Sequence, residues 1–551
     1  MSFAPSDPWP RSHHDLLEQY YAEYERQIAS GEYRPFLYPW GMLGALVAIV
    51  YLLIPHQDRP WLRHCRYLVF AWVTGFAIYT VLYTKARLIA PSFGVGLLSA
   101  WSVVWVGAIL ICNDAQADFM RIEKMRGVFG APTDKPKEKD TINHTESPHE
   151  GISKHENGDV KLSLSKATAG PSDRDGQFAW QPYPLTPFIE RLDWVLDLFC
   201  NFRGAGWNWR TSALPPPPKW IQEQLRQNCG PNTPKHSFKT HAGQAKSYTT
   251  RSQLIQANLK ALLKGYLALD ALKTLMMWDP YFWGLVDHTP SPSSHLPLTL
   301  YFLLHHHHPR ITHIYHLLLS MLAVKTALET IFTLGPLASC ILPTPYRHTA
   351  RTLPFLYPTP WGPFSTVLDH GLAGWWSNWW HQTFRFALDQ PSRVLREHWD
   401  LHKHSLRSRL LQLVTAFTVS GILHATASST ISGPSRPWSA SFAFFAVQAP
   451  AILLEGCVRR ALESCGVGRR VPRWGKRVLT LIYVHVWFYS TAHLLCDDFA
   501  RGGIWLFEPV PVSVFRGLGF GADERDGWWC WGGPLVRWHR GERWWDTGIA
   551  F

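Results

Sequence analysis

Three uncharged apolar runs near the start of the chain restrict its fold more than any other feature. They occupy residues 36–54, 67–84 and 93–112. Each comes close to the roughly 20 residues that a helix needs to cross a hydrocarbon core at about 1.5 Å per residue. Inside a bilayer the backbone must satisfy its own hydrogen bonds, which a helix does. The sequence therefore predicts an all-α polytopic membrane protein.

Further apolar runs follow in the rest of the chain. The clear candidates for membrane helices are 311–334, 409–428, 441–457 and 478–496, and the weaker ones are 255–275 and 296–304. The 29 tryptophans among 551 residues agree with this class, because tryptophan is enriched where a protein meets the two faces of a bilayer. We therefore expect a bundle of about eight to ten transmembrane helices.

The polar residues divide the chain into segments. A polar N-terminal segment (1–35) precedes the first three helices (36–112), and a polar loop (113–183) separates them from a core (184–510) and a C-terminal tail (511–551). The loop mixes charges with proline, glycine and serine, so it is predicted to be disordered. The first apolar run begins too late for a cleavable signal peptide. We expect an integral, multi-pass protein of an internal membrane, namely the endoplasmic reticulum.

The net charge of +13 does not indicate a nucleic-acid partner. The basic residues lie beside apolar runs and in loops, where they suit anionic lipid headgroups or an anionic substrate. His305–His308 form a run that could hold a metal ion, but the neighbouring sequence supplies no carboxylate or cysteine to complete a site. We therefore expect no functional metal and no nucleic acid.

One histidine stands out by its surroundings. His424 lies in residues 413–427, which otherwise contain only small and apolar side chains and a few hydroxyl groups. An ionisable group at membrane depth is costly and marks a functional site by default. A neutral imidazole is also the form that accepts a proton. A satisfied core histidine is the alternative interpretation.

A tryptophan-rich stretch, residues 375–385 (WWSNWWHQTFR), is the second unusual feature. A helix would place its four tryptophans on one broad face, the pattern of an interfacial anchor. His381, Gln382 and Arg385 would then cluster beside that face. Alone, the stretch could equally be an aromatic belt with incidental polar neighbours.

Several motifs together resemble one known family. They are WHQ-x-x-R at 380–385 and SGILH at 420–424, with RLDW at 191–194, NFRGAGWNW at 201–209, DPYFW at 279–283 and FAVQ at 445–448. In this order they are similar to the membrane-bound O-acyltransferase superfamily, and to its wax-synthase-like branch in particular. The resemblance covers about residues 185 to 510.

The resemblance implies a fold and a set of site residues. It implies an internal catalytic cavity in the helical bundle, with His424 as general base. His381 matches a second polar position that orients the acyl donor or assists the base. Trp380, Gln382 and Arg385 are then expected to bind the acyl donor.

The resemblance also implies an activity. It predicts acyl transfer, with acetyl from acetyl-CoA, to a hydroxyl of an apolar terpenoid or meroterpenoid in secondary metabolism. The partners would be acyl-CoA, a lipophilic alcohol and the lipid bilayer, with no tightly bound cofactor; the oligomeric state is left open. Two alternatives remain at this point: a long-chain wax-ester synthase and a non-enzymatic transporter or scaffold.

Overall fold

The computed structural model describes residues 10–125, 176–228, 243–287, 309–341, 349–466 and 470–551. Helices form most of it. The helices of the first half are α1 (His13–Ala29), α2 (Leu43–Leu53), α3 (Pro60–Tyr83), α4 (Ile89–Val106), α5 (Ala115–Asp118), α6 (Phe188–Cys200), α7 (Lys219–Gln227) and α8 (Arg251–Met277). Those of the second half are α10 (Pro309–Ile341), α11 (Ser365–Gly374), α12 (Arg385–His398), α13 (Leu406–Ser429), α14 (Ala443–Ala446), α15 (Gln448–Ser464), α17 (Arg473–Thr491) and α18 (His493–Arg501).

Among the described residues, six helical stretches are long and apolar enough to cross a membrane. They are Pro60–Tyr83, Ile89–Ile111, Pro309–Cys340, Leu406–Ser429, Pro437–Ser464 and Arg473–Arg501. Each contains one of the apolar runs predicted from the sequence. The chain is thus a mostly helical integral membrane protein, as expected.

The remaining predicted spans differ from these six. The run 36–54 forms α2, whose 11 residues reach only about 17 Å. The run 255–275 lies in α8, a 27-residue helix that buries Asp270 and Lys273. The run 296–304 falls outside the described residues. The described residues thus contain six candidate spans, and a total of eight to ten stays a prediction.

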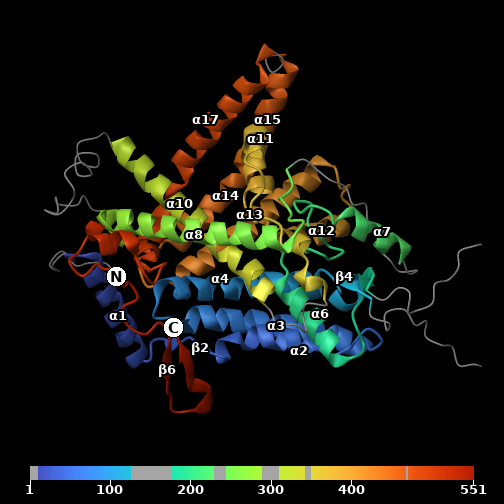
Figure 1. Cartoon of the computed structure of the whole chain (residues 1–551), viewed down its shortest axis with the longest axis horizontal. Helices are drawn as coiled ribbons and strands as arrows, with labels where there is room; N and C mark the ends of the chain where they lie inside the picture. The colour runs from blue at the N-terminus through green and yellow to red at the C-terminus, as the bar shows by residue number, and fades with distance from the viewer. Residues whose placement is uncertain (1–9, 126–175, 229–242, 288–308, 342–348, 467–469) are drawn as a thin grey trace, which may run out of the picture.

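The helices pack in layers that hold distant parts of the chain together (Figure 1). The first layer contains α2, α3 and α4, and α13 packs on α4. On the other side α8 packs along α10. Helix α11 contacts both α15 and α17, and the three helices project from the rest as an arm. The residues of the predicted site lie on α13 and around the base of this arm.

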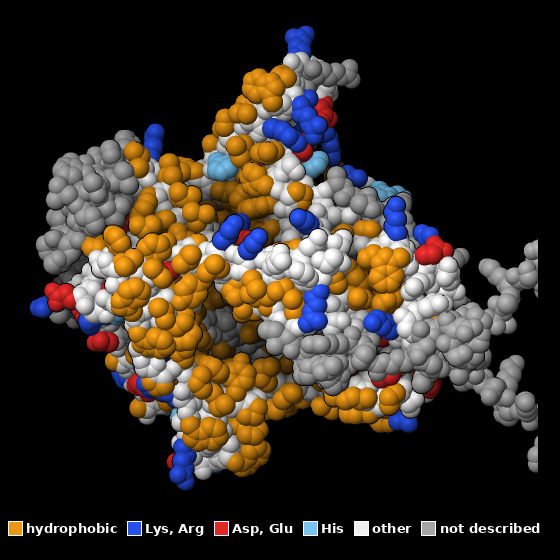
Figure 2. Space-filling model, in the orientation of Figure 1, with side chains coloured by type: hydrophobic (Ala, Val, Ile, Leu, Met, Phe, Trp, Pro, Cys, Tyr) orange, Lys and Arg blue, Asp and Glu red, His pale blue; other side chains and the backbone are white. Residues whose placement is uncertain are grey.

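The visible surface is largely apolar (Figure 2). The helices of the arm contribute many exposed side chains to it, namely Leu454, Val458, Leu462, Trp474, Val478, Leu479, Ile482 and Val486. Lysine and arginine gather toward the tip of the arm. An exposed apolar area of this extent suits contact with lipid.

Short strands join segments that are distant in the sequence. The strands are β1 (Arg34–Pro35), β2 (Leu37–Tyr38), β3 (Thr84–Lys85), β4 (Arg121–Lys124), β5 (Phe178–Gln181), β6 (Arg537–His539) and β7 (Gly548–Ala550). β1 pairs with β3 in parallel, and β2 and β6 both pair antiparallel with β7. The C-terminal tail is therefore bound to the segment that precedes the first membrane helices.

The predicted disordered loop is ordered at both ends, which corrects that part of the prediction. β4 and β5 form an antiparallel pair, in which Ile122 lies opposite Trp180. The pair is stable because Ile122 and Phe178 are buried with α7 residues in a small core. Residues 126–175 lie outside the described part of the chain.

A buried ion-pair network fixes α6 beside this strand pair. Arg121, on β4, donates to Asp193 at 2.5 Å and lies 3.4 Å from Asp197. Arg351 donates to Asp197 at 2.8 Å and also pairs with Glu123. Buried charges persist only when they are paired in this way. The RLDW motif, which contains Asp193, thus supports the fold.

Candidate functional site

His424 lies in the C-terminal part of α13. The helix begins at the N-cap Ser405, whose hydroxyl accepts from the backbone N–H of Ser408. Gly421 lets a neighbouring turn approach, because a Cβ there would lie 2.7 Å from the Phe442 ring. This approach brings α14 onto α13, and the His424 ring stacks on Phe445 at 4.3 Å between centroids. The Nδ1 of His424 is shielded from solvent and has no hydrogen-bond partner within the described residues.

The helix leading to the tryptophan-rich stretch is kinked. α11 bends at Gly371, where φ is +62°, a conformation that other residues rarely adopt. The Glu455 carboxylate occupies the space that a Cβ would need, and it accepts from the backbone N–H of Leu372 at 2.9 Å. Arg459 holds Glu455 at 2.9 Å. The kink therefore depends on a charged group contributed by α15.

After the kink the chain makes a π-helical turn, Trp375–Trp379, closed by a bond from the N–H of Trp380 to the carbonyl of Trp375 at 2.8 Å. Such turns are rare and frequently occur at functional sites. The tryptophans of the turn contact rings of other helices. Trp375 contacts Phe488 of α17, and Trp376 contacts Phe417 of α13 as well as Phe445. These contacts join the turn to its neighbours, and a position of the rings at the membrane interface stays a prediction.

His381 follows the π-helical turn and is surrounded by aromatic rings. Its ring centroid lies 5.5 to 5.9 Å from those of Phe332, Trp361, Trp380 and Phe384. Its Nδ1, like that of His424, is shielded and has no hydrogen-bond partner among the described residues. Burial lowers the pKa of His381 to about 3, with smaller contributions from the neighbouring His424 and Arg203. The imidazole is therefore neutral under all ordinary conditions.

The structure brings the two histidines into one aromatic neighbourhood. Phe445, which stacks on His424, contacts Trp376, and Trp376 contacts Trp380 next to His381. The direct electrostatic effect of His424 on His381 agrees with this closeness. Both histidines remain partly accessible despite the surrounding rings. Two neutral imidazoles with free nitrogens can exchange protons with a bound molecule.

Gln382 and Arg385 hold the turn in place. The Gln382 amide donates to the carbonyls of Trp376 at 2.9 Å and Trp380 at 2.6 Å. Its oxygen accepts from Arg385 at 3.1 Å, and Arg385 also donates to the carbonyl of Ser377 at 2.8 Å. Both donors of Gln382 are thus engaged with the backbone. Gln382 acts here as a positioning residue, and contact of Trp380, Gln382 or Arg385 with an acyl donor stays a prediction.

Two cations near His381 could not be assigned from the sequence pattern. The buried Arg203 donates to the carbonyls of Pro358 at 2.9 Å and Thr359 at 3.0 Å, and burial lowers its pKa to about 10. Lys325, on α10, lies 5.3 Å from the ring of Trp361, which itself contacts His381. Arg203 belongs to the NFRGAGWNW motif, but only the fold shows its proximity to His381. In the sequence, Lys325 could have been noticed because it is a charged residue within the apolar run 311–334.

The DPYFW motif and the later histidines form a separate cluster. Asp279 accepts from His316 at 2.8 Å, and the ring of Tyr281 stacks on His316 at 3.8 Å. The Tyr281 hydroxyl donates to Asp497 at 2.7 Å. The fold therefore brings a carboxylate from outside the neighbouring sequence to His316, on the helix that follows the histidine run. His305–His308 lie outside the described residues.

Gln448 connects the tryptophan-rich turn to α17. Its side-chain oxygen accepts from the indole N–H of Trp376 at 3.3 Å and of Trp487 at 3.0 Å. The residue is fully buried, and its amide donates to the carbonyl of Phe444 at 2.9 Å. One side chain thus satisfies polar groups from three helical segments.

We expect Gln448→Leu to lower the thermal stability of the purified protein by several degrees. Two buried indole N–H groups would lose their acceptor, at about 1–3 kcal/mol each. Thermal unfolding in detergent, followed by tryptophan fluorescence, measures the effect. Gln256→Leu, on the exposed face of α8, is the control. Equal midpoints for both variants would contradict the proposed connection.

Comparison with known proteins confirms the resemblance found in the sequence. Residues 357–447 match the family model described as "Membrane bound O-acyl transferase family". This segment contains His381, Gln382, Arg385 and His424. No solved structure matches the chain.

Three fungal proteins illustrate the similarity. "Acetyltransferase ataH" of Aspergillus terreus (strain NIH 2624 / FGSC A1156) is 27% identical over 197 residues, 33% of this chain and 62% of that protein. "Acetyltransferase TRI7" of Fusarium sporotrichioides is 30% identical over 185 residues, 30% of this chain and 40% of that protein. "O-Mevalon transferase yanI" of Aspergillus niger (strain ATCC 1015) is 24% identical over 361 residues, 62% of this chain and 65% of that protein. The matched region spans less than two thirds of each relative.

Proposed function

We propose that this chain, whose residues 357–447 match the membrane bound O-acyl transferase family, transfers an acyl group from acyl-CoA to a hydroxyl group. The observation that carries the proposal is the meeting of His424 and His381 in one aromatic neighbourhood, each with an unpaired Nδ1. A non-enzymatic transporter or scaffold would not need two neighbouring imidazoles with unpaired nitrogens.

The bundle around this site is proposed to enclose the reaction. The partial accessibility of both histidines inside a shell of aromatic side chains supports an internal cavity. We propose that α8 adds a seventh membrane segment to the six candidate spans, and that the shorter α2 enters the bilayer without crossing it. An apolar alcohol would enter from the bilayer of the endoplasmic reticulum, and acyl-CoA from the aqueous side.

The proposed reaction is a single displacement at the thioester carbonyl. The hydroxyl group of the acceptor gives its proton to neutral His424 while its oxygen bonds to the carbonyl carbon. An N–H of neutral His381 would stabilise the negative charge that develops on the carbonyl oxygen. The C–S bond then breaks, and the CoA thiolate takes the proton from His424. The products are an ester and CoA, and the histidine is restored.

The acyl donor is proposed to approach along the tryptophan-rich turn. Trp380 lies beside His381, and Gln382 and Arg385 fix the turn that presents both. Arg203 adds positive charge near His381, and Lys325, which pairs with Glu329, lies beside the ring of Trp361. Cations there would attract the phosphates of CoA.

Acetyl is the proposed acyl group, and an apolar terpenoid or meroterpenoid alcohol the acceptor. Two of the three relatives named above are described as acetyltransferases. The exposed apolar surface and the aromatic site suit an acceptor that dissolves in the bilayer. Secondary metabolism is the proposed setting.

Product formation by purified protein in detergent tests this proposal. Acetyl-CoA or palmitoyl-CoA is combined with a terpenoid alcohol or a long-chain alcohol, and ester and CoA are measured by mass spectrometry. We expect ester only with acetyl-CoA and the terpenoid. Preference for palmitoyl-CoA and the fatty alcohol would identify a wax-ester synthase instead. Absence of any ester across a panel of hydroxylated terpenoids would overturn the acetyltransferase proposal.

A further inference from the structure

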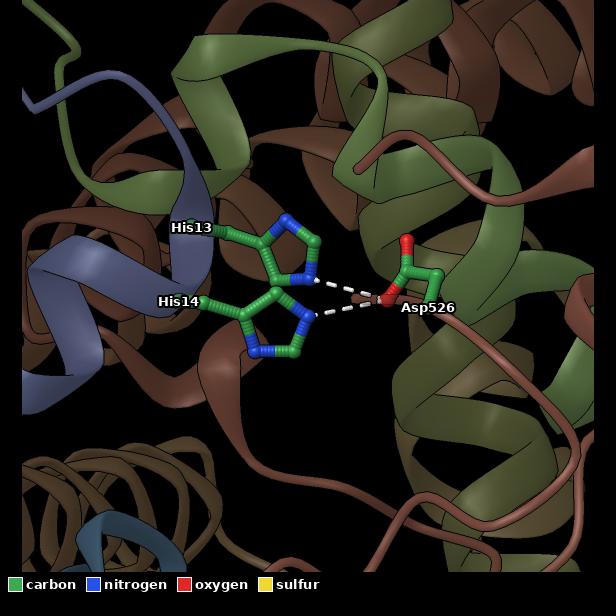
Figure 3. Close-up of side chains that lie close together, drawn as sticks. All are labelled: His13, His14 and Asp526. Carbon is green, nitrogen blue, oxygen red and sulfur yellow. Dashed lines mark hydrogen bonds and ion pairs between the residues drawn. The ribbon is translucent and has the colours of Figure 1, made fainter. Parts of the chain in front are cut away.

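A second cluster of chemically active side chains lies far from the proposed catalytic site, where the two ends of the chain meet. His13 and His14 begin α1, and Asp526 lies in the C-terminal segment, 512 residues after His14. The Nε2 atoms of both histidines point at one oxygen of Asp526 (Figure 3). The distances to that Oδ1 are 3.4 Å from His13 and 3.0 Å from His14.

His13 contributes a buried imidazole to this cluster. It is 2% exposed, its Nδ1 has no hydrogen-bond partner within the described residues, and its Nε2 lies 3.4 Å from Asp526 Oδ1, which is long for a hydrogen bond. Asp526 is held in place, because its Oδ2 accepts from the backbone N–H groups of Ala522 at 2.8 Å and Asp523 at 3.2 Å. Buried polar atoms normally make a close contact, so the long His13–Asp526 distance leaves His13 Nε2 able to bind a ligand. The half-buried His14 leaves a path from solvent.

The geometry suits a tetrahedral cation. The three ligand atoms lie within 4.8 Å of one another. In a tetrahedral site with metal–ligand bonds of about 2.0–2.1 Å, neighbouring ligand atoms are about 3.3 Å apart. The two measured distances to Asp526 Oδ1 are close to this value. Two imidazoles and a carboxylate form a donor set that Zn²⁺ accepts, with one position open to water.

The nearby cations do not occupy the site. Arg516 approaches Asp526 Oδ1 only to 4.0 Å. It instead forms a bidentate pair with Glu508, at 2.9 and 2.7 Å. Lys273 also pairs with Glu508, at 3.5 Å. Glu508 thus makes the closer contacts with both cations, and among the described residues the contacts of Asp526 Oδ1 below 3.5 Å are those with the two histidines.

We propose that His13, His14 and Asp526 bind one divalent zinc-like cation that ties α1 to the C-terminal segment. The metal ion would add to an existing contact between these two segments, because Arg525 donates to Asp15 on α1 at 2.6 Å. The site is therefore structural and separate from acyl transfer. No local motif could have revealed it, since its ligands come from opposite ends of the chain.

Zinc binding by the full chain in detergent tests this. All proteins carry alanine at His305–His308, because that run binds metals by itself. After chelator treatment and reloading with Zn²⁺, bound metal is counted by elemental mass spectrometry, and Co²⁺ absorption reports the ligand geometry. We expect one ion per chain, lost in His14→Ala and in Asp526→Asn. The exposed His64→Ala is the matched control and should keep the ion.

Stability supplies the second readout. Zn²⁺ should raise the unfolding midpoint of the parent protein and not that of His14→Ala, because a ligand stabilises only the state that binds it. If Asp526→Asn fails to fold, the test rests on His14→Ala. That variant keeps the contact of Arg525 with Asp15 on α1 and is expected to fold. Equal zinc content in the parent and His14→Ala would overturn the proposal, as would a parent that keeps no zinc. The latter result would leave a metal-free His14–Asp526 ion pair.

Discussion

Replacing His424 with alanine is expected to reduce ester formation about 10²–10⁴-fold, the contribution of a positioned general base. The substitution removes the proposed proton acceptor, while Phe445 and the rest of the aromatic neighbourhood remain. Initial rates with saturating acetyl-CoA and acceptor measure the loss. Extraction by detergent and the unfolding midpoint should change little, because the Nδ1 of His424 has no described partner to lose.

A histidine elsewhere in a membrane helix provides the control. His485 lies on the exposed face of α17, and its Nδ1 contacts the carbonyl of its own helix at Leu481, at 2.8 Å. His485→Ala should retain full turnover, since nothing places it near His424. A His424→Ala protein that keeps its turnover would remove the proposed base and with it the proposed chemistry.

Two substitutions of His381 should separate the contribution of its N–H donor from that of the packing of its ring. His381→Ala is expected to lower turnover about 10²–10³-fold, as the loss of an oxyanion donor does in other enzymes. His381→Asn retains an N–H donor and should lose much less. Burial holds the pKa of His381 near 3, so the residue stays a neutral donor and should add no step to the pH profile near neutrality.

The measurement is turnover and KM for acetyl-CoA in both variants, with the exposed His402→Ala as control. A donor that acts in the transition state lowers turnover more than it raises KM. Equal losses in His381→Ala and His381→Asn would show that the ring's packing against Trp361 and Phe384 matters, and not its N–H.

The sequence located the six long apolar helices well, while the roles of the two histidines stay predictions. α13 was predicted as 409–428 and spans Leu406–Ser429, because a long apolar run without strong charges has few alternatives to a membrane helix. His424 was recognisable as an ionisable group inside that run. His381 was recognisable only from its motif, since its local surroundings fit an aromatic belt equally well.

The sequence missed interactions that no local pattern records. The indole N–H of Trp376 donates to Gln448, 72 positions later, a contact that the sequence of the tryptophan-rich stretch does not reveal. The loop after residue 112 was predicted to be disordered from the polar composition of its middle part. Its two ends nevertheless pair as strands β4 and β5. In both cases a distant partner changed the environment of the segment.

The amino-acid pattern alone therefore determined where helices form and which of them can enter a bilayer, because hydrophobic period and length act over one segment at a time. Tertiary structure decided what each polar group meets. Arg203 and Lys325 approach His381, and Asp526 reaches His13, only after distant segments have packed. Such meetings depend on the packing of the whole chain, since apolar burial selects the arrangement of the helices without regard to their distance in sequence.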